Sequence, residues 1–153
     1  MFLVDTSVWI DYLRRSYNEQ ARWLNDILDR DFPVGITQDI YREILQGAKT
    51  EASFERLEEF FGSQTFYFPV DPLQSHMDAA RLYFRCRRAG LTVRSSADCL
   101  IAQIALEHDL LLLHNDRDFE AIASVEPKLR LYSGGLGHGE RRSVIHDSGA
   151  PRD

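Results

Sequence analysis

The sequence lacks the features of a secreted or membrane protein. It has only two cysteines, Cys86 and Cys99, which form no CxxC pair, so a disulfide framework or a zinc site has little support. No hydrophobic run is long enough to cross a membrane, and the residues before Asp5 have no basic region typical of a secretory signal. These absences predict a cytoplasmic protein without a membrane segment.

Positive charge is also scarce. Lys and Arg number 18 against 24 Asp and Glu, which gives a formal net charge of −6. This balance argues against a protein that coats nucleic acid through general electrostatic attraction. The basic residues are clustered, however, and a bound cation would offset part of the acidic charge. The distribution of the charges therefore matters more than their sum.

Strand-like and helix-like segments alternate along the first 132 residues. Short apolar or β-branched runs predict strands at 2–4, 34–36, 65–70, 110–113 and 129–132. Apolar residues at spacings of three and four predict helices at about 8–13, 19–31, 37–48, 51–61, 73–89 and 97–108, and a short one after Asp116. Thr6 or Ser7 is expected to cap the first helix, and Ser95 or Ser96 the sixth.

This alternation, without hairpin signals, predicts an α/β fold. We expect one three-layer α/β/α domain over residues 1–132, with a central and mainly parallel sheet. Residues 133–153 are polar and rich in glycine, so we expect a poorly packed C-terminal tail there.

Acidic residues occur where strands of such a sheet end. Asp5 follows the first predicted strand, and Asp116 and Asp118 follow the four leucines of the fourth. Ligand sites of open parallel sheets lie outside the carboxyl ends of the strands, so we expect these acids at one edge. Asp98 heads the apolar stripe of the sixth helix, where a carboxylate needs a hydrogen-bonding partner or a cation.

Each acid also has a simpler interpretation. An aspartate near a helix start is a good N-cap, and its charge is favourable at the positive end of the helix dipole. Glu43 could be a solvated helix residue or lie at the rim of a cleft. Several carboxylates at one edge would repel each other without a divalent cation, and oxygen ligands suit Mg²⁺ or Mn²⁺. Their convergence therefore favours a metal centre.

Basic residues gather on one predicted helix. Arg81, Arg85 and Arg88 share a face at spacings of four and three, and Arg94 follows before the next helix. This cluster could guide a phosphate backbone toward the acids. A solvated helix face whose arginines pair with nearby acids is an equal alternative. His114 lies beside the predicted acidic edge, but none of the five histidines has a zinc-binding spacing.

The chain resembles a known family through four strings in a fixed order. They are VDTSVWIDYL at 4–13, REILQG at 42–47, SSADCLIAQIAL at 95–106 and LLLLHNDRDFEAIA at 110–123. Together they look like a PIN-domain ribonuclease toxin of the VapC type, and the similarity covers roughly residues 2–132. The ordered set is far more specific than any one string.

The resemblance implies a site and a reaction. It implies that the catalytic acids are Asp5, Glu43, Asp98, Asp116 and Asp118, with Asp5, Asp98 and Asp116 as the metal ligands. The hydroxyl of Thr6 or Ser7 would hold a carboxylate or a water in place, and many relatives have Thr where this chain has His114. The implied activity is an Mg²⁺- or Mn²⁺-dependent endoribonuclease that inhibits translation by cutting tRNA or rRNA, leaving 3′-hydroxyl and 5′-phosphate ends.

The resemblance also implies a VapB-type antitoxin as partner and a homodimer. Two other interpretations remain. A Mg-binding receiver-like domain also gathers acids at strand ends, but it needs a paired acid after the first strand and a lysine after a late one, which this sequence lacks. A non-catalytic α/β interaction module, whose acids are only caps, would not be stabilised by Mg²⁺ or Mn²⁺.

Overall fold

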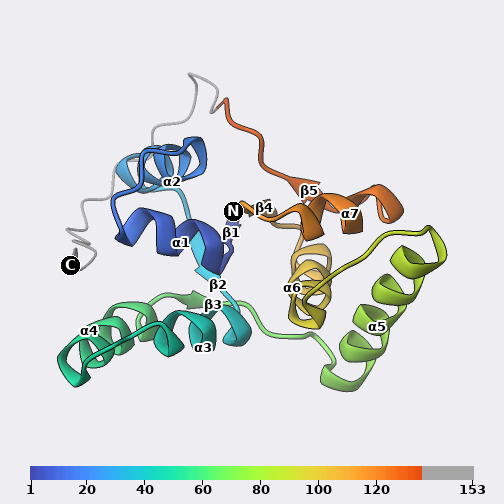
Figure 1. The fold of residues 1–153 in the computed structure, drawn as a ribbon, viewed down its shortest axis with the longest axis horizontal. Coiled ribbons are helices and arrows are strands. Elements are labelled where there is room, and N and C mark those ends of the chain that lie inside the picture. Colours follow the sequence, from blue (N-terminus) through green and yellow to red (C-terminus); the bar gives the residue numbers. More distant parts are fainter. Residues whose placement is uncertain (136–153) are drawn as a thin grey trace.

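The computed structural model describes residues 1–135, which form a five-stranded sheet and seven helices (Figure 1). The strands are β1 (Phe2–Val4), β2 (Val34–Ile36), β3 (Thr65–Phe66), β4 (Leu111–Leu113) and β5 (Arg130–Leu131). The helices are α1 (Thr6–Leu13), α2 (Glu19–Asp29), α3 (Gln38–Gln46), α4 (Glu51–Gly62), α5 (Pro72–Arg88), α6 (Ser96–Glu107) and α7 (Arg117–Val125). The predicted tail, residues 133–153, lies outside the described residues except for its first three positions.

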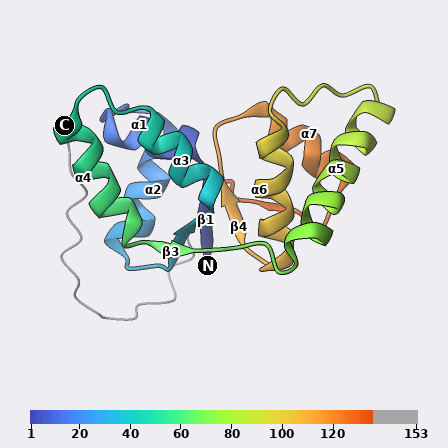
Figure 2. The same ribbon diagram turned by 90° about the horizontal axis from the view of Figure 1, so that it is seen from below.

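The sheet has the strand order β3-β2-β1-β4-β5, and all its pairings are parallel. The predicted α/β/α architecture is confirmed. The chain builds the sheet outward from β1 to β3 and then returns to place β4 on the other side of β1. Such a reversal is a topological switch point, where the loops after β1 and β4 leave a crevice for a ligand. Figure 2 shows α1–α4 on one side of β1 and β4 and α5–α7 on the other.

The central strands lie in the core because helices cover the sheet. Leu3 of β1 and Leu112 of β4 are fully buried, as expected for parallel strands enclosed on both faces. Trp9 of α1 packs edge to face on Phe61 of α4, with ring centroids 4.9 Å apart. No helix among residues 1–135 is both long enough and apolar enough to cross a membrane.

The strand predicted at 65–70 is shorter than expected. Pairing with β2 covers two residues, and the backbone N–H of Tyr67 adds one more bond to that strand. The backbone then turns toward α6. The N–H of Val70 donates to the carboxylate of Glu107 at 3.1 Å, and Nε2 of His108 lies 2.8 Å from the carbonyl oxygen of Phe68. These tertiary contacts override the strand propensity of the aromatic residues.

The caps of two helices differ from the prediction. α1 begins at Thr6, and its N-cap is Asp5, whose carboxylate accepts the backbone N–H of Ser7. Ser95 occupies the N-cap position of α6, but its side chain makes no capping hydrogen bond. Asp116 caps α7, as predicted by the simpler interpretation of this acid as an N-cap. Two acids of the predicted site are therefore also caps, so capping does not argue against a role in the site.

Candidate metal centre

The five predicted acids come from four parts of the fold. Asp5 follows β1, Glu43 lies on α3, Asp98 lies in the first turn of α6, and Asp116 and Asp118 lie at the start of α7. Because β1 and β4 are adjacent and parallel, their carboxyl ends open at the same edge of the sheet. The backbone N–H of Asp5 donates to the carbonyl of Leu113 at 2.9 Å, which extends the β1–β4 pairing as far as the first acid.

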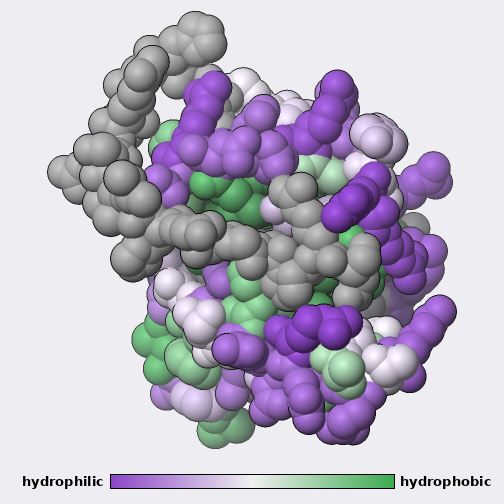
Figure 3. Space-filling view, turned by 90° about the vertical axis from the view of Figure 1, so that its left-hand side faces the viewer, coloured by the Kyte–Doolittle hydropathy of each residue, from purple (hydrophilic) through white to green (hydrophobic). Residues whose placement is uncertain are grey.

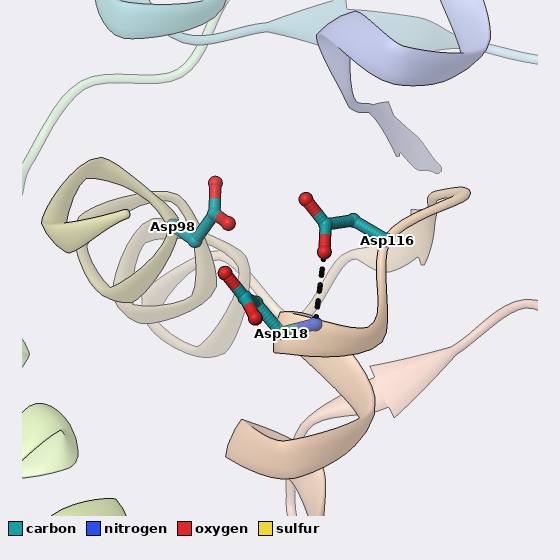
Figure 4. A group of neighbouring side chains, drawn as sticks. All are labelled: Asp98, Asp116 and Asp118. Atoms are coloured by element: carbon teal, nitrogen blue, oxygen red, sulfur yellow. Dashed lines mark hydrogen bonds between the residues drawn. The ribbon is translucent and has the colours of Figure 1, made fainter. Parts of the chain in front are cut away.

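Asp98, Asp116 and Asp118 form a close acidic group. Each offers one carboxylate oxygen, and these three oxygens lie within 4.8 Å of one another. Figure 4 shows their side chains pointing toward one another from α6 and from the start of α7. Oxygen ligands lie about 2.1 Å from Mg²⁺, so opposite ligands of one ion are about 4.2 Å apart. A small rotation of one side chain, or one bridging water, therefore lets the group share a cation.

Asp98 is the acid whose burial is least offset by hydrogen bonds. Only 6% of its surface is exposed, and its Oδ2 has no hydrogen-bond partner among the described residues. Burial, followed by the charges of the four other acids, raises the pKa of Asp98 from 3.8 to about 8. A nearby cation would offset both the lost hydration and the repulsion. The orphaned oxygen and the all-carboxylate donor set fit a hard divalent ion such as Mg²⁺ or Mn²⁺.

Hydroxyl groups of α1 hold the two remaining acids. Ser7 Oγ donates to Asp5 Oδ2 at 2.6 Å, and Thr6 Oγ1 donates to Glu43 Oε2 at 2.7 Å. Burial raises the pKa of Asp5, the hydrogen bonds from Ser7 oppose this rise, and the charge of Glu43 adds to it. The two hydroxyls therefore orient both acids. They hold Asp5 in a buried position, where the ionised carboxylate is less stable than in water.

The predicted ligands and the close group differ by one residue. The sequence predicts Asp5, Asp98 and Asp116 as ligands, whereas the close group has Asp118 in place of Asp5. Asp5 still acts on the same site, because its charge is the largest cause, after burial, of the raised pKa of Asp98. The negative charge of Asp5 would thus also act on a cation held by the close group.

The loop after β4 is fixed by contacts that no sequence pattern indicated. The backbone N–H of Asn115 donates to Ser7 Oγ at 3.1 Å, so one hydroxyl links the loop of Asp5 to the loop of Asp116. His114 turns its Nδ1 toward the backbone N–H of Asp116, which donates to it at 3.1 Å. Burial lowers the pKa of His114, which favours the neutral ring that this hydrogen bond needs. His114 therefore shapes the loop as an acceptor.

Arg94 is adjacent to the acids. Its guanidinium lies 3.4 Å from Asp116 Oδ1 and 3.7 Å from Asp118 Oδ1. Its backbone N–H also donates to Asp118 Oδ2 at 2.9 Å. The side chain is 71% exposed, so these ion pairs are screened by water and contribute little to stability. The guanidinium of Arg94 thus lies at the exposed side of the acidic group.

The other three predicted arginines lie on α5 and do not contact the acids. Arg85 pairs with Glu126, the C-cap of α7, at 3.1 Å, as the alternative interpretation predicts. Arg81 and Arg85 also line a groove of about 760 Å³ that none of the five acids lines. The guanidinium of Arg88 lies over the ring of Phe84, 5.9 Å from its centroid. These contacts fit the alternative interpretation for Arg85, and a role of these arginines in RNA binding stays a prediction.

A profile of the PIN domain matches residues 2–125. The chain belongs to the PIN-domain family. VapC ribonuclease Mb1587 of Mycobacterium bovis and ribonuclease VapC11 of Mycobacterium tuberculosis are each 36% identical to it over 129 residues, which are 82% of this chain and 93% of each relative. The resemblance to the VapC type is therefore confirmed.

Solved structures share the fold of this PIN domain. That of VapBC2 from Rickettsia felis, bound to a DNA fragment from its promoter, superposes with a TM-score of 0.64 at 18% identity. That of VapBC-1 from nontypeable Haemophilus influenzae gives a TM-score of 0.65 at 18% identity. Each comparison covers 86% of this chain and 96% of the other. At this identity the likeness supports the fold.

The hydroxyl of Thr6 in this PIN domain provides a test of the site. Thr6→Val keeps the size of the side chain but removes the donor that holds Glu43 at 2.7 Å. Loss of a group that orients an acid of a metal site costs about 10- to 100-fold in metal affinity or activity. We expect a loss of this size in the initial rate of Mg²⁺-dependent RNA cleavage, because Glu43 would no longer be held in place. Thr6→Ser keeps the donor and is the matched control, and equal rates of both variants would rule out a role for the hydroxyl.

Proposed function

We propose that the chain is a metal-dependent endoribonuclease and the toxin of a VapBC-type toxin–antitoxin pair. It would inhibit translation by cutting tRNA or rRNA. The observation that carries this proposal is the group Asp98, Asp116 and Asp118 at the switch point of the sheet, together with the orphaned Oδ2 of Asp98. The names of the VapC relatives, which are ribonucleases, support the reaction class.

The residues of the site have separate roles in this reaction. Asp98, Asp116 and Asp118 would hold a Mg²⁺ or Mn²⁺ ion, and the nearby charge of Asp5 would favour its binding. When bound, the ion activates a water and stabilises negative charge on the phosphoryl oxygens. Glu43 has one oxygen held by Thr6 and the other available to accept a proton from the attacking water. The bond to the 3′-oxygen then breaks and this oxygen takes up a proton from solvent, which leaves 3′-hydroxyl and 5′-phosphate ends.

We also propose a VapB-type antitoxin partner, a homodimer and a cytoplasmic location. The antitoxin is supported by the shared fold with VapBC2 and VapBC-1. The homodimer is supported by Leu73, Met77 and Phe84 of α5, which are 84%, 44% and 55% exposed. Spacings of four and seven place them on one helix face, and a second copy would remove this apolar surface from water.

Purified chain incubated with total RNA tests the activity directly. With Mg²⁺ or Mn²⁺ we expect new 5′-phosphate ends at defined positions in tRNA or rRNA, mapped by sequencing of the 5′ ends. EDTA should abolish them, because no carboxylate of the site can replace a Lewis acid. Cleavage that persists in EDTA would contradict the metal-dependent mechanism. No cleavage, together with no shift of the melting temperature by Mg²⁺, would favour the non-catalytic interaction module.

A further inference from the structure

A basic groove lies at a distance from the acids. It has a volume of about 370 Å³ and is lined by Arg14, Gly47, Lys49, Thr50, Ser53 and Arg56. These residues supply three cations and two hydroxyls and include no Asp or Glu, although the whole chain carries a net charge of −6. We propose that this basic groove binds a backbone phosphate of the RNA whose cleavage is proposed above, so this inference rests on that function.

The basic groove is built where three helix ends meet. Arg14 is the C-cap of α1, Gly47 is the C-cap of α3, and Thr50 is the N-cap of α4. The first turn of α4 therefore presents its positive dipole end to the groove, where the cations gather. Thr50 Oγ1 accepts the backbone N–H of Ser53 at 3.1 Å. This bond fixes the turn at the wall of the groove.

Two of the cations are available for a ligand. Within residues 1–135, neither Arg14 nor Lys49 forms an ion pair with an Asp or Glu side chain. Both side chains belong to exposed residues. Like charges that line one small groove repel each other, and a phosphate removes this repulsion while it accepts charge-assisted hydrogen bonds.

The surface around this part of the fold suits an ionic ligand. Figure 3 views the molecule from the side of α2 and α4 and shows hydrophilic side chains interspersed with apolar patches. Because the lining of the basic groove is polar, an extended apolar partner would gain little there. A flexible, negatively charged strand fits this surface better.

Helices α1 and α3 connect the basic groove to the metal centre. Thr6 beside the acids and Arg14 in the groove lie at the two ends of α1, about 12 Å apart at 1.5 Å per residue. Glu43 precedes Gly47 by about one turn of α3. A nucleic-acid strand carries a phosphate about every 3.4 Å of rise. A strand with one phosphodiester at the acids can therefore place another phosphate in the groove a few nucleotides away.

A purely structural role is the alternative for these cations. Positive charge near a helix C-terminus stabilises the helix dipole, and Arg14 and Lys49 both follow such an end. That role predicts a lower melting temperature after their replacement and no specific effect on RNA binding. The two explanations therefore differ in what they change.

The double variant Arg14→Gln/Lys49→Gln tests the inference. Its matched control is Arg22→Gln/Arg30→Gln, which removes the same charge from α2, including a C-cap arginine. Affinity for a fluorescent single-stranded RNA is measured by anisotropy in EDTA, so that no cleavage is needed. We expect affinity about tenfold weaker in the test variant at moderate salt, and a salt slope lower by about 0.7, since one phosphate contact is lost and each contributes about 0.7. The control should bind like the wild type.

Other results would overturn the inference. Equal affinity of the test variant and the wild type would show that the groove does not bind RNA. If the control variant loses as much RNA affinity as the test variant, the effect comes from the lower net charge and not from the groove. If the test variant loses RNA affinity and also melts at a lower temperature, the structural role is favoured. Cleavage in Mg²⁺ is measured separately. If the test variant binds RNA more weakly but the wild type cuts no RNA, the proposed activity alone is refuted. If the wild type cuts RNA and the test variant binds and cuts as well as the wild type, the inference alone is refuted.

Discussion

Replacement of Asp98 by asparagine is expected to abolish metal-dependent RNA cleavage while the fold stays intact. The amide has the shape of the carboxylate but neither its charge nor its affinity for a hard cation. Loss of a group that only orients a ligand costs about 10- to 100-fold, so loss of the ligand itself should lower the rate by more than about 100-fold. The fold should persist because the replacement removes a buried charge that burial and four acids disfavour. Initial rates in Mg²⁺ and melting temperatures in EDTA measure the two effects.

Asp26→Asn is the matched control for this experiment. Asp26 lies on α2, is exposed and takes no part in the acidic group. The control should cleave RNA at the wild-type rate. Undiminished cleavage by Asp98→Asn would remove Asp98 from the site. A lower rate accompanied by a much lower melting temperature would show that the variant has lost its fold rather than its ligand.

The metal-free protein is expected to lose stability as the pH rises from about 4 to about 8 through the ionisation of Asp98. The pKa of Asp98 is about 8 in the folded chain and 3.8 as its ordinary value. Between these values the folded state binds one more proton than the unfolded state, so the free energy of unfolding falls with rising pH. The stabilisation that comes from protonated Asp98 is complete at pH values below its ordinary pKa and is lost above its pKa in the folded chain. Asp98→Asn should lack this part of the pH dependence, which melting curves in EDTA measure.

Added Mg²⁺ should reverse this loss. A carboxylate must be deprotonated to bind the ion, so each pH unit below the folded pKa costs about tenfold in affinity. The rise in melting temperature with millimolar Mg²⁺ should therefore be larger at pH 8 than at pH 6 in the wild type, and absent in Asp98→Asn. No rise at either pH would contradict a metal centre. An equal rise in wild type and variant would place the ion elsewhere.

Most of the fold follows from local patterns. The alternation of apolar runs with three- and four-residue periodicity predicts the twelve elements found within residues 1–135, because buried parallel strands and amphipathic helices each have their own spacing. The boundary of β3 could not be predicted in this way. Its aromatic residues favour a strand, but the contacts of Val70 and Phe68 with α6 depend on how distant helices pack.

The site was predictable to different degrees. Asp5 and Asp116 follow strands, and Asp98 heads an apolar stripe, so the rule for parallel sheets brings them to one edge. Glu43 had no such signal, because its bond to Thr6 joins residues 37 positions apart. The contacts of Ser7 and His114 with backbone N–H groups could not be predicted either, since every residue except proline offers that donor. The resemblance to a known family indicated Glu43, whereas the contacts of Ser7 and His114 with the loop after β4 came from the structure alone.

The acids are spread along the chain from residue 5 to residue 118, on elements that meet only in the finished sheet. A growing polypeptide on the ribosome therefore has an incomplete set of carboxylates until β4 has paired with β1 and the start of α7 has followed. Fragments produced by proteolysis between these elements should be inert for the same reason. An activity assembled in this way requires folded chain through the start of α7, so shorter products of the same gene should carry no cleavage activity.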